Sequence, residues 1–131
     1  EPEDALRCAD HGAAGVVVSN HGGRQLDRTP ATIEVLPEIA EALAGRAEVW
    51  VDGGIRRGTD VLTALALGAR VVLAGRQPIW GLAARGTEGA RETIELMWEE
   101  LRVAMHLTGC RALDEIGPHV LRRRPGTIGG P

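Results

Sequence analysis

Three short runs rich in β-branched residues recur along the chain and predict strands. The runs are GVVVS at 15–19, EVWVD at 48–52 and RVVLA at 70–74. Each run is apolar almost throughout and does not alternate with polar residues, which is typical of strands buried on both faces of a parallel sheet. We therefore expect three parallel strands.

Segments with helical periodicity lie before, between and after these runs. Residues 1–12 have a proline and acidic residues at their start and a glycine at their end, which is typical of a helix. Residues 31–44, 59–67 and 88–107 repeat apolar positions at helical spacing. Strands that alternate with helices predict an α/β fold with right-handed crossovers. Two architectures fit this order, the doubly wound sheet and the (β/α)8 barrel.

The number of predicted strands bears on how much of a domain the chain contains. A barrel of this kind takes eight strands and roughly 250 residues, so three strands cannot close one. The chain also starts within a helical segment, and no linker divides it. We expect one incomplete domain over residues 1–121, and we interpret residues 122–131 as a flexible tail.

Composition and charge exclude several classes of protein. The 131 residues are 44% hydrophobic and carry a net charge of -3, which argues against a general nucleic-acid-binding protein. No apolar stretch approaches the roughly 20 residues of a membrane span. Cys8 and Cys110 lie far apart without the spacing of a metal site or a disulfide framework. We expect a cytoplasmic protein without a bound metal.

Candidate chemistry follows each predicted strand. The segments are SNHGGRQLD at 19–27, DGGIRRGTD at 52–60 and AGRQPIW at 74–80. The carboxyl ends of parallel strands meet at one edge of the sheet, where the active sites of such folds lie. We therefore expect the three glycine- and arginine-containing segments to face one pocket.

The second and third segments have the composition of an anion site. Gly53 and Gly54 allow backbone N–H groups to approach a ligand closely, Arg56 and Arg57 follow them, and a helix is expected to begin near Gly58. The third segment adds another glycine and an arginine. Amides, a helix N-terminus and guanidinium groups together favour a phosphate. The alternative is that the glycines only form turns and the arginines are solvated.

The first segment places a histidine and an arginine beside this predicted anion site. Histidine titrates near neutral pH and can accept a proton from a substrate, and an arginine can hold a carboxylate through two parallel hydrogen bonds. His21 and Arg24 would together suit a small acid with a hydroxyl next to its carboxylate. The alternative for His21 is a loop residue that only bonds the backbone.

Three segments resemble one enzyme family over nearly the whole chain. SNHGGRQLD, DGGIRRGTDVLTALALGA and LTGCRALDEI are similar to the C-terminal part of the FMN-dependent α-hydroxy-acid oxidising enzymes, which include glycolate oxidase, lactate oxidase and mandelate dehydrogenase. The resemblance implies a TIM (β/α)8 barrel, of which this chain would contain strands six to eight and their helices. It also implies an FMN cofactor.

The resemblance also implies roles for individual residues. His21 matches the active-site base and contacts the substrate, and Arg24 matches the arginine that binds the substrate carboxylate. The cofactor-binding residues would be Ser19, Asp52, Gly53, Gly54, Ile55, Arg56, Gly75 and Arg76. The family's flavin-contacting lysine and substrate-binding tyrosines belong to upstream segments, and this chain contains neither lysine nor tyrosine. We therefore expect the chain to be inactive alone.

The implied reaction is oxidation of a small 2-hydroxy acid to the 2-keto acid, with electrons passed to oxygen, a quinone or another carrier. The resemblance also implies a homo-oligomer at full length. A non-catalytic half-barrel that binds an anion, or pairs with a complementary half, is the alternative of a different class. Other phosphate-binding barrels, such as those like inosine monophosphate dehydrogenase, are a third possibility. The sequence leaves the particular acid and the electron acceptor open.

Overall fold

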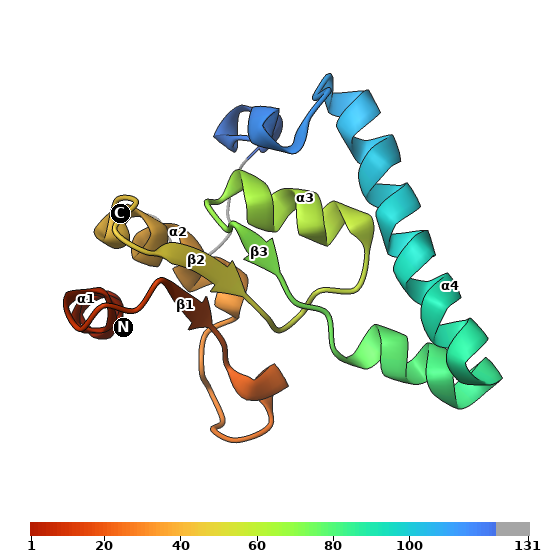
Figure 1. Ribbon diagram of the computed structural model, residues 1–131, viewed down its shortest axis with the longest axis horizontal. Coiled ribbons are helices and arrows are strands. Elements are labelled where there is room, and N and C mark those ends of the chain that lie inside the picture. The colour runs from red at the N-terminus through yellow and green to blue at the C-terminus, as the bar shows by residue number, and fades with distance from the viewer. Residues whose placement is uncertain (123–131) are drawn as a thin grey trace.

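The computed structural model describes residues 1–122 and contains a small sheet, four α-helices and three short 3-10 helices (Figure 1). The elements are α1 Pro2–Asp10, β1 Gly15–Val18, η1 His21–Gly23, α2 Thr32–Leu43, β2 Glu48–Val51, α3 Gly58–Ala66, β3 Val71–Val72, α4 Arg76–Thr108, η2 Leu113–Glu115 and η3 Pro118–Val120. Residues 123–131 of the predicted tail lie outside the described residues. Within residues 1–122, no helix is long and apolar enough to cross a membrane.

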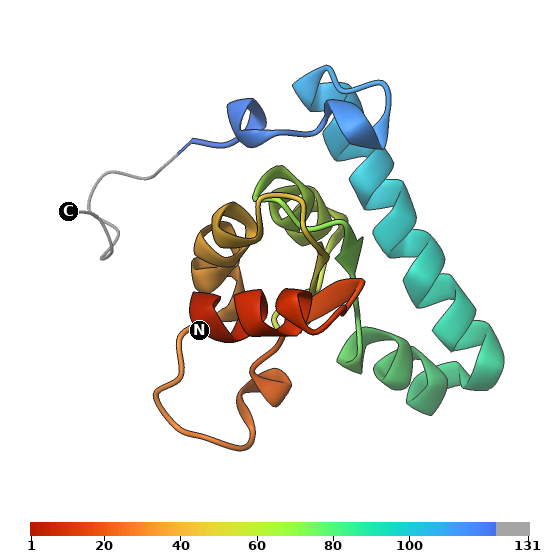
Figure 2. The ribbon, with the colours of Figure 1, turned by 60° about the vertical axis from the view of Figure 1, so that its left-hand side comes forward.

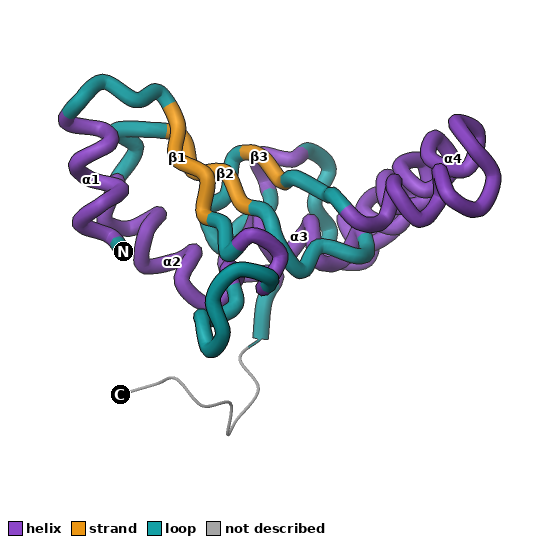
Figure 3. The backbone as a smooth tube through the Cα atoms, turned by 90° about the horizontal axis from the view of Figure 1, so that it is seen from below, coloured by secondary structure: helices purple, strands orange, loops and turns teal. Residues whose placement is uncertain are grey.

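The three strands form one parallel sheet in the order β1-β2-β3, which confirms the predicted α/β fold. Val18 pairs with Val51, and Val51 pairs with Val72, so the strands end at one edge. The strand order does not reverse, and successive right-handed crossovers then place their helices on the same face. Figure 3 shows α1, α2 and α3 on one side of the strands.

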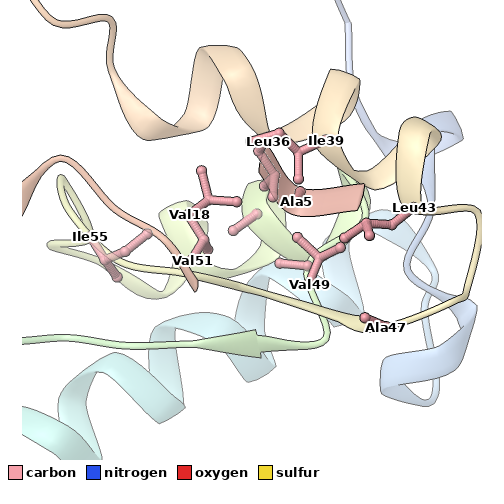
Figure 4. Packing of buried hydrophobic residues seen from close by; sticks show 11 residues of the cluster. Ala5, Val18, Leu36, Ile39, Leu43, Ala47, Val49, Val51 and Ile55 are labelled. Carbon is pink, nitrogen blue, oxygen red and sulfur yellow. The ribbon is translucent and has the colours of Figure 1, made fainter. Parts of the chain in front are cut away.

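The core lies between this face of the sheet and the helices. Val18, Val49 and Val51 point toward α2, where Leu36 and Leu43 are fully buried (Figure 4). Each such side chain contributes roughly 1.5–3 kcal/mol when it is removed from water. A second cluster, between α3 and the C-terminal half of α4, contains Leu62, Ala66, Leu101, Ala104, Cys110 and Ile116. The helix α3 is therefore covered by the sheet on one side and by α4 on the other.

The opposite face of the sheet is open, so the prediction of strands buried on both faces is wrong for the described chain. Val17 is 44% exposed and Trp50 is only partly buried. Parallel register places Val17, Trp50 and Val71 on this same face. No helix covers them because both crossovers run on the other side. The open face is apolar, although the Trp50 indole N–H donates to Glu48 Oε2 at 2.9 Å.

The helix α4 is a hairpin of two helical segments and not one straight rod (Figure 2). Arg85 and Gly86 have non-helical dihedral angles where the chain reverses. A Cβ atom on Gly81 would lie 2.3 Å from the Gly89 carbonyl oxygen, so the two segments pack backbone to backbone. The predicted helix 88–107 matches the second segment. The sequence predicts no helix over the first segment, which begins at Arg76.

Contacts with α4 fix the start of α3. Glu100 accepts hydrogen bonds from the Arg57 guanidinium, at 2.7 and 3.1 Å, and from the Gly58 N–H at 2.9 Å. The hydrogen bond from Arg57, followed by the one from Gly58, lowers the pKa of the Glu100 carboxyl from its ordinary value of 4.5. A Cβ atom at position 58 would lie 2.1 Å from the Leu101 nitrogen. Glycine is therefore required where the two helices touch.

We predict that Glu100→Gln destabilises the protein near neutral pH and that this effect shrinks in acid. The pKa of Glu100 is lowered in the folded state, so its stabilisation is present above the ordinary carboxyl pKa and is lost as the pH falls through the lowered value. Urea unfolding of both proteins at about pH 7 and about pH 3 measures the difference. Glu41→Gln, at an exposed position of α2 that forms no ion pair within residues 1–122, serves as the control. A difference that does not change with pH would contradict the prediction.

Candidate anion and proton-transfer site

A cavity of about 300 Å³ lies where the segments after the three strands meet. These segments emerge on the same side of the molecule in Figure 1, below the sheet. The lining of the cavity includes all but one of the site residues predicted from the sequence. They are His21, Arg24, Asp52, Gly53, Gly54, Ile55, Arg56, Gly75 and Arg76.

Ser19 is the predicted site residue that does not line this cavity. It follows β1 directly, and its Oγ accepts the His21 backbone N–H at 3.1 Å. In the described chain, the Ser19 side chain therefore supports the turn that carries His21. Its predicted contact with the flavin stays a prediction.

The turn after β1 has a strained backbone that presents its side chains. His21, Gly22 and Gly23 all have positive φ angles, of 54°, 69° and 72°. A histidine in this region is uncommon, and such strain occurs at sites where the surroundings impose it. The His21 imidazole and the Arg24 guanidinium are exposed and have no hydrogen-bond partner within residues 1–122. Both groups are available to a ligand in the cavity.

The arginines divide into structural and ligand-facing groups. Arg24, Arg56 and Arg76 line the cavity, and none forms an ion pair within the described part of the chain. Arg57 points elsewhere and pairs with Glu100. The cavity therefore has three guanidinium groups against one carboxylate, that of Asp52, and attracts anions.

Arg76 also links two of the three segments. Its Nη2 donates to the Gly22 carbonyl oxygen at 3.3 Å, although the two residues are far apart in the sequence. Arg76 is the first residue of α4, and Gly75 before it has no side chain that could cap the helix. A helix N-terminus of this kind offers free N–H groups and a positive dipole end to an anion. The third segment thus contributes both an amide-rich helix start and a guanidinium group.

The helix N-terminus near Gly58 does not contribute as expected. Asp60 Oδ2 accepts the N–H groups of Arg56 and Arg57, both at 2.9 Å, and Glu100 accepts that of Gly58. These amides are already satisfied by carboxylates, which would repel a second anion. The free N–H groups at a helix start, which were expected at α3, are therefore found at the start of α4.

The turn after β2 contributes two glycines with unusual backbone angles. Gly53 and Gly54 have φ angles of 87° and 80°. A Cβ atom on Gly53 would lie 2.9 Å from Asn20 Oδ1 and 3.3 Å from Thr32 Oγ1, so this position is crowded as well as left-handed. The N–H groups of Gly53 and Gly54 donate no hydrogen bond within residues 1–122. Two free amides therefore border the cavity.

Asp52 Oδ1 is buried and has no hydrogen-bond partner in the described chain. A buried carboxylate oxygen without a donor is costly, which indicates that a ligand group donates to it. The negative charge of a phosphate would be repelled by this carboxylate, whereas a hydroxyl can donate a hydrogen bond to it. Asp52 is thus suited to a hydroxyl group of a ligand whose anionic end lies among the amides and arginines.

Sequence reasoning missed the apolar wall of the cavity. It consists of Leu73, Ile79 and Trp80, together with the buried amide side chain of Gln77. Trp80 lies four residues after Arg76 in α4 and therefore on the same helix face. Pro78 does not prevent this helix, because proline is tolerated in the first turn of a helix.

Comparisons with known proteins agree with the resemblance that the sequence motifs carry. Residues 1–123 match a family model described as FMN-dependent dehydrogenase. The chain is 53% identical to 2-hydroxyacid oxidase 1 of Mus musculus over 123 residues, covering 94% of the chain and 33% of the relative. It is 61% identical to a peroxisomal (S)-2-hydroxy-acid oxidase of Oryza sativa subsp. japonica over 114 residues, covering 87% of the chain and 31% of the relative.

A solved structure has the same fold over most of the chain. A mandelate oxidase variant with the C4a-OH-FMN adduct superimposes with a TM-score of 0.84 and 56% identity, covering 87% of this chain and 35% of that one. The chain spans about a third of the length of the curated relatives it matches.

We predict that Gly53→Ala weakens the binding of inorganic phosphate roughly tenfold, because it crowds Asn20 and Thr32 and tilts the free amides. Gly23→Ala is the matched control, since Gly23 also has a positive φ angle but has nothing within 4 Å of the added Cβ and does not line the cavity. The control should change the affinity by no more than about twofold. Isothermal titration calorimetry measures both affinities, and equal losses would count against the crowding argument.

Proposed function

The chain belongs to the FMN-dependent dehydrogenase family, and on this premise we propose that it takes part in the FMN-dependent oxidation of a small 2-hydroxy acid to the 2-keto acid. The observation that carries the proposal is the shared cavity, which contains His21 and Arg24 next to the two free amides and two further arginines. The curated relatives named as 2-hydroxyacid oxidases support the same substrate class.

We further propose that residues 1–121 are the C-terminal part of a (β/α)8 barrel, comprising strands six to eight. The strand order without reversal supports a barrel over a doubly wound sheet, whose order reverses at a switch point. The open apolar face of Val17, Trp50 and Val71 supports it as well, because a barrel buries that face in its interior. The likeness to mandelate oxidase has the same implication.

The donor set of the cavity fits FMN. The N–H groups of Gly53 and Gly54 and the guanidinium groups of Arg56 and Arg76 would hold the phosphate, which is doubly charged near neutral pH. The orphaned oxygen of Asp52 would accept a hydrogen bond from a hydroxyl of the ribityl chain. Ile55, Gly75 and Ser19 complete the proposed cofactor-binding set. When bound, FMN supplies the redox chemistry by taking two electrons from the substrate.

The substrate would be held and activated by the turn after β1. Arg24 would bind the carboxylate through a two-pronged hydrogen bond, which fixes the position of the neighbouring carbon. His21 would accept a proton from the hydroxyl group or from that carbon as the two electrons leave. Ile79 and Trp80 form an apolar wall on one side of the cavity. Oxygen, a quinone or another carrier would be the final electron acceptor.

A second candidate is a non-catalytic half-barrel that pairs with complementary segments, in another chain or another copy. The open sheet face and the partly exposed β1 edge favour pairing of this kind. Under this alternative the anion cavity would remain, but oxidation would not occur when the upstream barrel segments of a relative are supplied. A homo-oligomeric state of the complete protein belongs to the first proposal.

A chimera tests the catalytic proposal. In it, residues 1–123 replace the matching third of the mouse 2-hydroxyacid oxidase. We predict that Arg24→Lys weakens binding of a 2-hydroxy acid at least about tenfold and leaves FMN affinity nearly unchanged, because lysine cannot form the two-pronged contact. Arg28→Lys is the control, since Arg28 is exposed on the same loop and does not line the cavity. Equal losses of acid and FMN affinity would contradict the assignment.

For the same chimera we predict that His21→Asn retains FMN but slows anaerobic bleaching of the yellow flavin absorbance by a factor of about a hundred or more. Asparagine tolerates the positive φ angle of 54° at this position, so the turn is preserved while the base is lost. His119→Asn, in η3 and outside the cavity, is the control. Rapid bleaching of the His21→Asn protein by lactate or glycolate would exclude His21 as the base.

A further inference from the structure

We propose that Thr32 is a positioning residue for the anion site, holding the two peptide groups after β2 so that their N–H groups face the cavity. This inference rests on the proposed phosphate site and extends it to a residue outside the cavity lining. Thr32 is the first residue of α2, and it is only 3% exposed. Within the described chain only one other polar side chain, that of Gln77, is buried to a similar degree.

The hydroxyl of Thr32 contacts two successive carbonyl groups. Its Oγ1 donates to the Asp52 carbonyl oxygen at 2.7 Å and lies 3.1 Å from that of Gly53. A hydroxyl has a single proton, so the two oxygens share it. The hydroxyl belongs to α2, whereas both carbonyls belong to the turn that leaves β2. The contact therefore fixes the turn relative to the start of a helix.

The planarity of the peptide bond means that this contact also determines where the N–H groups of Gly53 and Gly54 point. The described chain contains no cis peptide bonds, and in a trans peptide the C=O and N–H groups point in opposite directions. The Asp52 carbonyl shares its plane with the N–H of Gly53, and the Gly53 carbonyl shares its plane with the N–H of Gly54. With both carbonyls held toward Thr32, both N–H groups point to the other side of the turn.

That other side is the cavity. Gly53 and Gly54 line it, whereas Thr32 does not. Neither N–H group has an acceptor within residues 1–122, so their orientation is not fixed by bonds of their own. Glycines at positive φ are also the residues whose peptide planes rotate most freely. The Thr32 hydroxyl supplies the restraint that the glycines lack.

Ligand binding and amide signals of the 131-residue chain test this role. Wild-type protein should bind FMN more tightly than riboflavin, which lacks the phosphate, and inorganic phosphate should shift the ¹H–¹⁵N signals of Gly53 and Gly54. Thr32→Val should lower the affinities for phosphate and FMN roughly tenfold and leave riboflavin affinity within about twofold. Thr32→Ser should retain both affinities because it keeps the hydroxyl.

Thr63→Val is the matched control, since the Thr63 hydroxyl bonds the Thr59 carbonyl inside its own helix and should not affect phosphate. If the Thr32→Val protein fails to fold in a thermal melt, Thr32→Cys replaces it, because a thiol of similar size donates only weakly. The same loss of phosphate affinity is expected for it.

The outcomes separate the two proposals. Unchanged phosphate affinity in Thr32→Val, or in Thr32→Cys where it is used, overturns the positioning role and leaves the phosphate site intact. Equal losses of FMN and riboflavin affinity overturn it too, because they indicate a purely structural effect. A wild-type chain that binds FMN no better than riboflavin, with unmoved Gly53 and Gly54 signals, overturns the proposed phosphate site itself.

Discussion

Parallel pairing of the three strands in register decides where the polar groups of the site lie. Because Val18, Val51 and Val72 pair side by side, the segments that follow the strands leave from one edge of the sheet. The pairing is held by the burial of these valines against the helices on a single face. A slip of one residue would turn the core side chains to the open face and separate the segments. The apolar core and the polar cavity therefore depend on the same register.

Packing of α4 on α3 decides which cationic group remains for a ligand. Glu100 takes the Arg57 guanidinium and the Gly58 amide, and Asp60 takes the two amides before it. These carboxylates therefore occupy the N–H groups of Arg56, Arg57 and Gly58 at the start of α3. Arg56, the residue before Arg57, is left without a carboxylate and faces the cavity. The different roles of the two adjacent arginines are thus set by Glu100 of α4, which lies 43 residues after Arg57 in the sequence.

The sequence predicted the parts of this arrangement that local rules control. The β-branched runs, the helix boundaries near 31–44 and 59–67, and the position of polar residues after strands follow from periodicity and from the geometry of parallel sheets. Nine of the ten predicted site residues accordingly line one cavity. Ser19 was the exception, because a residue at the end of a strand can point either along the edge or back to its own turn. Only the backbone path after β1 decides between them.

The remaining features could not be predicted because they depend on contacts between distant segments. Pro78 is compatible with both a loop and the first turn of a helix, and the pairing of Gly81 with Gly89 across the hairpin makes the helix favourable. Thr32 illustrates the same limit most clearly, since threonine at a helix start predicts at most a local cap. Its hydroxyl instead bonds carbonyls twenty residues away. A side chain can therefore orient ligand-facing amides from outside the cavity, and only the tertiary structure reveals that it does so.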